Sequence, residues 1–135
     1  MEEKNIDKVL RVLENGTELN LGIFPDTNIV KYGYSNTENE LALFIQGMNK
    51  EIEKIKNYIE KNEIVNFNKW SKDGYFVSGE GNVIILETKD EKTNGLKKIM
   101  EQQIKTDGNS NIDENEIMNL FLFKIIVKNT TILKY

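Results

Sequence analysis

The side chains that could do chemistry in this chain are carboxylates, lysines and hydroxyls. The 135 residues include no histidine and no cysteine, and Arg11 is the single arginine. The chain therefore lacks the commonest general base, the commonest metal ligand and any thiolate site or disulfide. With a single arginine, it also has few guanidinium groups, which bind phosphates and carboxylates through two parallel hydrogen bonds. Acid–base chemistry would have to come from a pair of carboxylates.

The carboxylates do not form a recognisable pair. Glu14, Glu51 and Glu60 are spread along the chain, and no two carboxylates share an apolar setting that would separate their pKa values. Most fit solvated helix faces beside lysines, as Glu53 does with Lys56. We therefore predict no catalytic residues and no enzyme activity.

Two segments have the spacing of a ligand-binding loop but lack residues that such a loop requires. Residues 105–116 are spaced like a calcium loop, but Lys105 stands at the first ligand position and Ser110 where that loop has glycine. Gly79 and Gly81 lack the helix start and the lysine–hydroxyl pair of a phosphate loop, which favours a hairpin turn. We predict no metal-binding and no cofactor-binding residues.

Charge and hydropathy restrict the partners. The net charge is −4 and the pI about 5.0, which argues against nucleic acid and anionic membranes. The N-terminus does not resemble a signal peptide, and no apolar run reaches the ~20 residues of a membrane span. The composition predicts one cytoplasmic domain that neither binds nucleic acid nor inserts into a membrane.

The longest periodic run covers residues 37–62. Thr37 and Glu40 have the spacing of a capping box. Six apolar residues follow at alternating spacings of four and three, which predicts an α-helix over 37–62: Leu41, Ile45, Met48, Ile52, Ile55 and Ile59. The other elements would pack around this helix.

A second packing surface is predicted on the same helix. Ala42, Leu43 and Gly47 lie off the apolar stripe. A glycine inside a helix costs about 1 kcal/mol relative to alanine, so a close backbone approach would explain Gly47. The alternative is that Leu43 is a single exposed leucine, which is common on protein surfaces.

Shorter elements flank this run. Periodicity and turn residues predict helices at 3–14 and 96–104 and strands at 19–23, 30–34, 64–70, 75–78 and 83–86. A polar loop at 106–111 precedes a short helix and an apolar end at 122–135, which forms one strand or two.

The order of these elements from residue 3 to about 105 resembles the Roadblock family of dynein light-chain-like proteins. Residues 19–34, LNLGIFPDTNIVKYGY, are similar to the first hairpin of that family. Residues 73–99 are similar to its closing hairpin, last strand and final helix, which begins at Asn94, Gly95 and Leu96.

The resemblance implies an α+β fold with a five-stranded antiparallel sheet and helices on both faces. The order would be α-β-β-α-β-β-β-α, followed by a C-terminal helix-strand extension. Residues 1–106 would form the Roadblock-like domain, and residues 107–135 would pack on it as the extension.

The resemblance also implies a function and a partner. Members of the family dimerise through the long helix and the third strand and bind Ras-like small GTPases as regulators or scaffolds. The implied homodimer interface contains Ala42, Leu43, Gly47, Phe67 and Trp70. The expected protein is thus a non-enzymatic regulator or scaffold of a small GTPase.

Two alternatives remain open. A small-molecule sensor would place Tyr32, Tyr34, Tyr75 and Trp70 around a pocket. A stand-alone inhibitor or immunity-type protein would also suit a small acidic domain. A cavity inside one protomer would favour the sensor.

Overall fold

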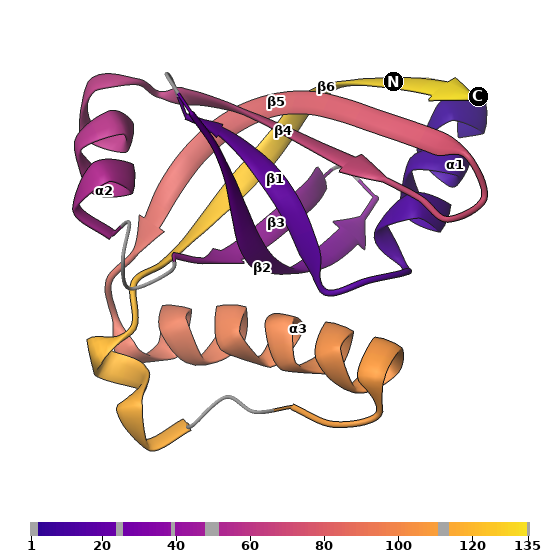
Figure 1. The fold of residues 1–135 in the computed structure, drawn as a ribbon. Coiled ribbons are helices and arrows are strands. Elements are labelled where there is room, and N and C mark those ends of the chain that lie inside the picture. Colours follow the sequence, from indigo (N-terminus) through magenta and orange to yellow (C-terminus); the bar gives the residue numbers. More distant parts are fainter. Residues whose placement is uncertain (1–2, 24–25, 39, 48–51, 111–113, 135) are drawn as a thin grey trace.

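The protein forms a closed β-barrel with helices packed around it (Figure 1). The computed structural model describes residues 3–23, 26–38, 40–47, 52–110 and 114–134. The elements are α1 (Glu3–Leu13), β1 (Glu18–Ile23), β2 (Asp26–Thr37), β3 (Glu40–Gln46), α2 (Ile52–Lys61), β4 (Ile64–Trp70), β5 (Tyr75–Leu86), α3 (Lys89–Asp107), the 3-10 helix η2 (Glu114–Asn119) and β6 (Leu122–Lys134).

The six strands follow the order β1-β2-β3-β6-β5-β4, and β4 pairs with β1 to close the barrel. All pairs are antiparallel. The last strand, β6, lies between β3 and β5, so the segment beyond residue 107 supplies a strand of the barrel itself.

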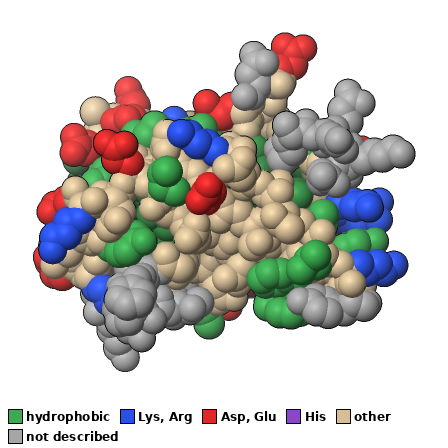
Figure 2. Space-filling view, turned by 90° about the horizontal axis from the view of Figure 1, so that it is seen from above, with side chains coloured by type: hydrophobic (Ala, Val, Ile, Leu, Met, Phe, Trp, Pro, Cys, Tyr) green, Lys and Arg blue, Asp and Glu red, His purple; other side chains and the backbone are tan. Residues whose placement is uncertain are grey.

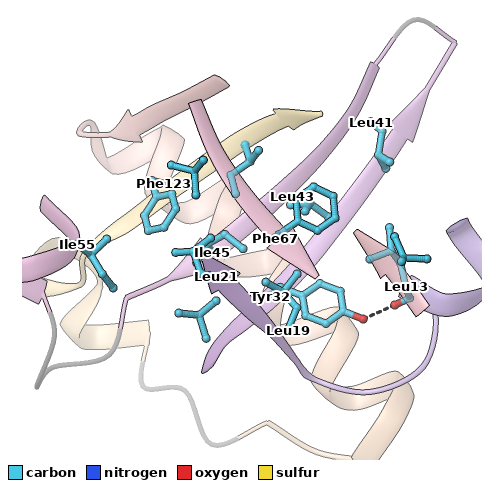
Figure 3. Close-up of a cluster of buried hydrophobic side chains, with 14 of the residues drawn as sticks. Leu13, Leu19, Leu21, Tyr32, Leu41, Leu43, Ile45, Ile55, Phe67 and Phe123 are labelled. Carbon is cyan, nitrogen blue, oxygen red and sulfur yellow. Dashed lines mark hydrogen bonds between the residues drawn. The ribbon is translucent and has the colours of Figure 1, made fainter. Parts of the chain in front are cut away.

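The barrel interior is filled by alternate side chains of every strand (Figure 3). Successive residues of a strand point to opposite faces, so residues two apart share the inner face. Leu41, Leu43 and Ile45 of β3 are all buried in this way, and Phe67 and Phe123 meet them from β4 and β6. Small barrels are packed by their own side chains and need no internal ligand.

α3 covers the outside of β2 and β3. Its Leu96 and Ile99 bury against Ala42 and Phe44, the outward-facing residues of β3. Thr88 caps the helix, because its hydroxyl accepts from the Glu91 N–H at 3.1 Å while the Glu91 carboxylate accepts from the Thr88 N–H. The capped helix thus forms a second apolar layer outside the barrel.

Gly33 determines how closely α3 approaches. A Cβ built on Gly33 would lie 2.2 Å from the Lys98 carbonyl oxygen. Only glycine lets the β2 and α3 backbones lie this close. The contact places α3 over β2 rather than over another strand.

α1 and α2 lie at opposite ends of the barrel (Figure 1). Val9, Val12 and Leu13 of α1 and Ile55 and Ile59 of α2 are buried in the barrel core. The two helices therefore cover the ends of the barrel and leave part of its side wall free.

Side-chain donors fasten the C-terminal end of α1 to the barrel. The Tyr32 hydroxyl donates to the Leu13 carbonyl (Figure 3). The Gln102 amide donates to the Leu13 carbonyl at 3.0 Å and the Gly16 carbonyl at 2.7 Å. The Lys69 ammonium donates to the Glu18 carbonyl at 2.8 Å. Tyr32 and Gln102 thus satisfy a carbonyl that the end of α1 leaves without an intrahelical partner, while Lys69 joins β4 to the start of β1.

The predicted fold class is wrong. The structure has a closed six-stranded barrel in place of a five-stranded sheet with helices on both faces. The predicted long helix at 37–62 is the main cause, because Glu40–Gln46 form the strand β3 and the helix α2 covers Ile52–Lys61. Met48, which belonged to the predicted stripe, lies outside the described residues.

Residues 41–45 were misassigned because they are apolar on both faces. Leu41 and Ile45 are four apart, a spacing that fits one face of a helix and also one face of a strand. Ala42, Leu43 and Phe44 complete an unbroken apolar run, and all five residues are buried. Such a run is typical of a strand enclosed on both sides.

The elements outside this region agree better with the sequence. The helix at 3–14 and the strands at 19–23, 30–34 and 64–70 are confirmed. The strands predicted at 75–78 and 83–86 are one continuous strand, β5, so the hairpin turn predicted at Gly79 and Gly81 is wrong. The C-terminal end is the single strand β6.

Among the described residues, no helix combines the length and the apolar character that crossing a membrane requires.

Replacing Gly33 by alanine is expected to destabilise the protein by about 2 kcal/mol, since overpacking at a rigid backbone contact costs about 1–3 kcal/mol. Gly22→Ala is the matched control. A Cβ on Gly22 would lie 3.4 Å from the Asn66 Cβ, an ordinary contact, so its unfolding free energy should stay within about 0.5 kcal/mol of wild type. Urea unfolding of both variants measures the difference; equal losses would contradict the close approach of α3.

Lys69→Met is expected to change the pH dependence of stability. Burial lowers the pKa of Lys69, against a smaller opposing effect of Glu18. As the pH rises through this lowered pKa toward the usual 10.5, the folded state loses the proton first. The free energy of unfolding therefore rises with pH in this window, and this contribution disappears in the variant. Urea unfolding at several pH values tests it: curves that stay parallel would show that the Lys69 pKa is not lowered by folding.

Candidate functional site

Among the described residues, no helix lies over one side wall of the barrel (Figure 1). It consists of the outward-facing positions of β4, β5 and the C-terminal half of β6, with Asn20 and Gly22 of the neighbouring β1; we call it the open face. Figure 2 looks down on this side of the molecule and shows a broad tan area, made of backbone and of side chains that are neither apolar nor charged, with apolar side chains on either side of it.

The register places the residues of the open face in rows across the strands. At one end, Trp70, Phe76 and Leu133 lie side by side on β4, β5 and β6; we call them the aromatic row. Toward the other end, Ile64 and Ile84 are diagonal neighbours on β4 and β5, and we call them the isoleucine pair. These apolar groups flank the polar centre.

The centre of the open face is built from amides and hydroxyls. Its outward-facing side chains are Asn66, Asn68, Ser78, Glu80, Asn129 and Thr131. The Asn20 amide donates to the Asn68 side-chain oxygen at 2.9 Å, and the Asn129 amide donates to the Glu80 carboxylate at 3.0 Å. These bonds orient side chains from neighbouring strands.

The polar centre is hollowed. A depression of about 430 Å³ lies over it. Beneath it, Gly79 faces the barrel interior, where a Cβ would lie 2.6 Å from the ring of Phe67. A Cβ on Gly81 would lie 2.2 Å from the Ile126 carbonyl oxygen. The lack of a side chain at Gly79 lets β5 lie close to Phe67 beneath the depression, and at Gly81 it lets the β6 backbone come close.

The depression can bind but has no obvious catalytic group. Asparagine amides donate and accept hydrogen bonds, as hydroxyls do. Among the described residues that line it, Glu80 is the one with a charged side chain. Among the residues that the structure describes, no group of three or more acidic side chains is placed to hold a metal ion.

A larger hollow of about 650 Å³ lies between the ends of α1 and α3. Glu14, Lys72, Asp73 and Lys105 contribute to its lining, and all four side chains are exposed. Long exposed side chains lose conformational entropy when they bind a ligand. We therefore favour the depression, whose walls are strand residues held by the sheet, although it is the smaller hollow.

Two further hollows flank η2. One, of about 480 Å³, lies between α2 and η2, where the Lys56 ammonium is 5.4 Å from the centre of the Phe121 ring. Lys92, on its rim, is already bonded to the carbonyls of Met118 and Leu120, each at 3.0 Å. The other, of about 210 Å³, is a groove along α3. Neither combines a rigid wall with a converging set of polar groups.

The structure does not bring the five predicted interface residues onto one surface. Leu43 and Phe67 point into the barrel core, and Ala42 lies under α3. Gly47 packs against Phe121, to whose carbonyl its N–H donates at 3.0 Å. Trp70 is 56% exposed and belongs to the open face.

Sequence reasoning missed the polar centre. The alternation of β4 contains the signal, since Val65 and Phe67 are buried while Asn66 and Asn68 between them face outward. On β5 the same alternation continues through Gly79 and Gly81, where the glycines were interpreted as a turn.

No protein-family model matches the sequence, and no curated protein matches it. Solved structures share its fold. Flavocytochrome Anf3 from Azotobacter vinelandii matches 100% of this chain and 72% of that chain, with a TM-score of 0.71 and 10% identity. A NimC/NimA family protein from Clostridium acetobutylicum matches 98% of this chain and 87% of that chain, with a TM-score of 0.63 and 14% identity. An FAD-binding protein from Mesorhizobium loti matches 98% of this chain and 94% of that chain, with a TM-score of 0.51 and 15% identity.

At these identities the likeness establishes the fold alone. By their own descriptions the matched structures are a flavocytochrome, a NimC/NimA family protein and an FAD-binding protein, and what they share with this chain is the fold. The resemblance to the Roadblock family is therefore wrong, because it rested on an element order that the barrel does not have. The expected regulation of a small GTPase depended on that resemblance and is wrong as well. The chain is a six-stranded barrel that shares its fold with the structures named above.

Proposed function

We propose that this protein binds a small, mainly uncharged heterocyclic ligand of the flavin type in the depression of the open face. The supporting observation is the depression itself, where amides and hydroxyls from three strands surround a hollow that is flanked by apolar side chains. Binding sites of this size place a few oriented polar groups within apolar surroundings. The proposal develops the sensor alternative and replaces the GTPase hypothesis.

The lining fits the uncharged parts of a flavin. The polar edge of an isoalloxazine ring has carbonyl acceptors on either side of an N–H donor. Asn66, Asn68 and Asn129 can complement both kinds of group, because an amide side chain has an acceptor oxygen and a donor nitrogen. The Asn20–Asn68 bond fixes which way the Asn68 oxygen is engaged, which leaves its amide nitrogen available to a ligand acceptor.

The lining does not fit a phosphate. It contains no lysine and no arginine among the described residues, and the Glu80 carboxylate would repel a second anion. A phosphorylated flavin would therefore need to direct its phosphate away from the depression. A bound flavin would supply electron-transfer chemistry, whereas the residues of this chain would bind and orient the ring.

We propose binding, without catalysis by the chain's own side chains, as the basic activity. The chain has no histidine and no cysteine, so the depression cannot hold the commonest acid–base or thiol groups. Ser78 and Glu80 would act as hydrogen-bonding groups in this arrangement.

Riboflavin is expected to bind saturably, and Asn66→Leu or Ser78→Ala should weaken binding about tenfold each, because each variant leaves a buried ligand group without its partner. Flavin fluorescence titration measures the affinity. Lys105→Gln, in the hollow between α1 and α3, is the matched control and should bind like wild type. No binding to the folded protein, or equal weakening in the control, would refute the site.

The same titration with FMN tests the placement of the charge. FMN should bind no more tightly than riboflavin, because no cation among the described lining residues meets its phosphate. Affinity for FMN that exceeds that for riboflavin by about tenfold or more would show that the phosphate occupies a cationic site outside the depression.

A further inference from the structure

We propose that the hollow between the ends of α1 and α3 binds a small amino-acid-like zwitterion. The Lys69 ammonium would bind the carboxylate of this ligand, and the carboxylates of Glu14 and Asp73 would face its ammonium group. The hollow and the depression have no described lining residue in common, so a ligand here would be independent of the flavin site.

The Lys69 ammonium is buried without a counter-ion. Lys69 is 8% exposed, and no carboxylate among the described residues forms an ion pair with it. An ammonium has three N–H donors. One of them donates to the Glu18 carbonyl at 2.8 Å, and the centre of the Tyr32 ring lies 5.3 Å from the nitrogen. A buried charge is costly unless it is paired, so an anionic group supplied by a ligand would stabilise this ammonium.

Gly16 leaves this ammonium accessible from the hollow. A Cβ built on Gly16 would lie 2.7 Å from the Lys69 nitrogen, and Gly16 itself lines the hollow. Any other residue at this position would place its side chain against the nitrogen. The φ angle of +92° at Gly16 favours glycine as well. A ligand in the hollow can therefore approach Lys69 over the bare backbone of Gly16.

Hydrogen bonds from α3 hold this part of the hollow in place. The Gly16 carbonyl accepts from the Gln102 amide at 2.7 Å and from the Thr106 hydroxyl at 3.2 Å. Lys69 is held in turn by its bond to the Glu18 carbonyl. Groups that are already fixed lose little entropy when a ligand binds. Lys69 thus supplies what the long, exposed side chains around the hollow lack.

The lining of the hollow contains both signs of charge. Lys72 and Lys105 belong to it, and so do Glu14 and Asp73. None of these four side chains forms an ion pair among the described residues. The two carboxylates would repel a ligand that is only anionic, and the lysines would repel one that is only cationic. A zwitterion suits both, because its carboxylate can lie at Lys69 while its ammonium lies toward the carboxylates.

Two of these charged groups are restrained by their neighbours. The Ser71 hydroxyl donates to the Asp73 carboxylate at 2.5 Å, and this bond lowers the pKa of Asp73, which is therefore ionised at neutral pH. The Lys105 ammonium lies 5.0 Å from the centre of the Tyr34 ring, within the range of a cation–π contact. The hollow thus keeps one charge of each sign near a set position in addition to Lys69.

Three small probes test the charge pattern. L-Alanine carries both charges, propionate carries the carboxylate alone, and ethylamine carries the ammonium alone. NMR titration of the folded protein at low salt is expected to show saturable binding of L-alanine with a dissociation constant of about 1 mM or below, and binding of either analogue at least about tenfold weaker. The backbone amides of Gly16 and Thr106, which line the hollow, should shift with L-alanine.

Lys69→Met should weaken L-alanine binding at least about tenfold, because methionine has a similar length but no ammonium. Lys92→Met is the matched control. Lys92 also donates to backbone carbonyls, those of Met118 and Leu120, but near the other end of α3. Its replacement should leave the affinity for L-alanine unchanged. Circular dichroism and thermal unfolding verify that each variant is folded.

A double variant, Glu14→Gln with Asp73→Asn, tests the other end of the ligand. It removes the two carboxylates, so it should weaken L-alanine binding about fivefold and tighten propionate binding about two- to fivefold at low salt. Both side chains are exposed, and a gain of affinity for propionate cannot arise from misfolding. The double variant therefore tests the site even if Lys69→Met does not fold.

No saturable binding of L-alanine, or equal weakening by Lys69→Met and Lys92→Met, would overturn the site. Propionate that binds wild type as tightly as L-alanine does would overturn the role of the two carboxylates. Riboflavin should bind Lys69→Met as it binds wild type, since Lys69 is not part of the depression. A protein that binds L-alanine but no flavin would uphold this site and overturn the proposed function, and the reverse result would do the opposite.

Discussion

The structure depends on β6 pairing with two strands at once. Its N-terminal half lies between β3 and β5, and its C-terminal half continues along β5. This pairing joins segments that are far apart in the sequence. It gives residues 122–126 of β6 a strand on both sides, whereas residues 127–134 pair with β5 alone among the described strands. It also gives β3 two buried faces, because the barrel core lies on one side and α3 on the other.

Closure of the barrel determines where a site can lie. The interior is occupied by side chains such as Tyr32, Phe67 and Phe123, which leaves the outer wall and the helix junctions. α1 and α2 close the ends, and the Gly33 contact holds α3 over β2. Among the described residues, no helix lies over the wall formed by β4, β5 and the C-terminal half of β6, and the depression lies in this wall. The ligand site proposed above for this depression follows from this distribution of the helices.

The polar group at the end of the barrel shows how helices are held without extensive salt bridges. Tyr32, Lys69 and Gln102 come from β2, β4 and α3, and they donate to carbonyls at Leu13, Gly16 and Glu18. Each donor offsets part of the cost of burying a backbone carbonyl. The burial that lowers the Lys69 pKa is a cost of its bond to the Glu18 carbonyl. The bonds from Tyr32 and Gln102 hold the end of α1 against the barrel.

Local sequence patterns predicted correctly those elements that bury one side and expose the other. The helix at 3–14 and the strand at 64–70 each alternate between a buried and an exposed side, and their periods were read correctly. Residues 41–45 are all buried, so the spacing of their apolar side chains cannot distinguish a helix from a strand. The helical spacing of the residues that follow led to the prediction of a helix where the structure has β3. Gly79 and Gly81 were assigned to a turn because glycine permits turns and close approaches equally well.

The sequence by itself determined the composition of the site and the chemistry that it lacks. The chain has no histidine, no cysteine and one arginine. Whatever its fold, it could not form a site that uses a histidine as acid or base, a cysteine thiol, or several arginines that bind an anion. The tertiary structure decided which residues meet. Asn66, Ser78 and Asn129 come from three different strands. Only the pairing register of the barrel brings them together around one depression. Register depends on long-range pairing, which no local pattern encodes.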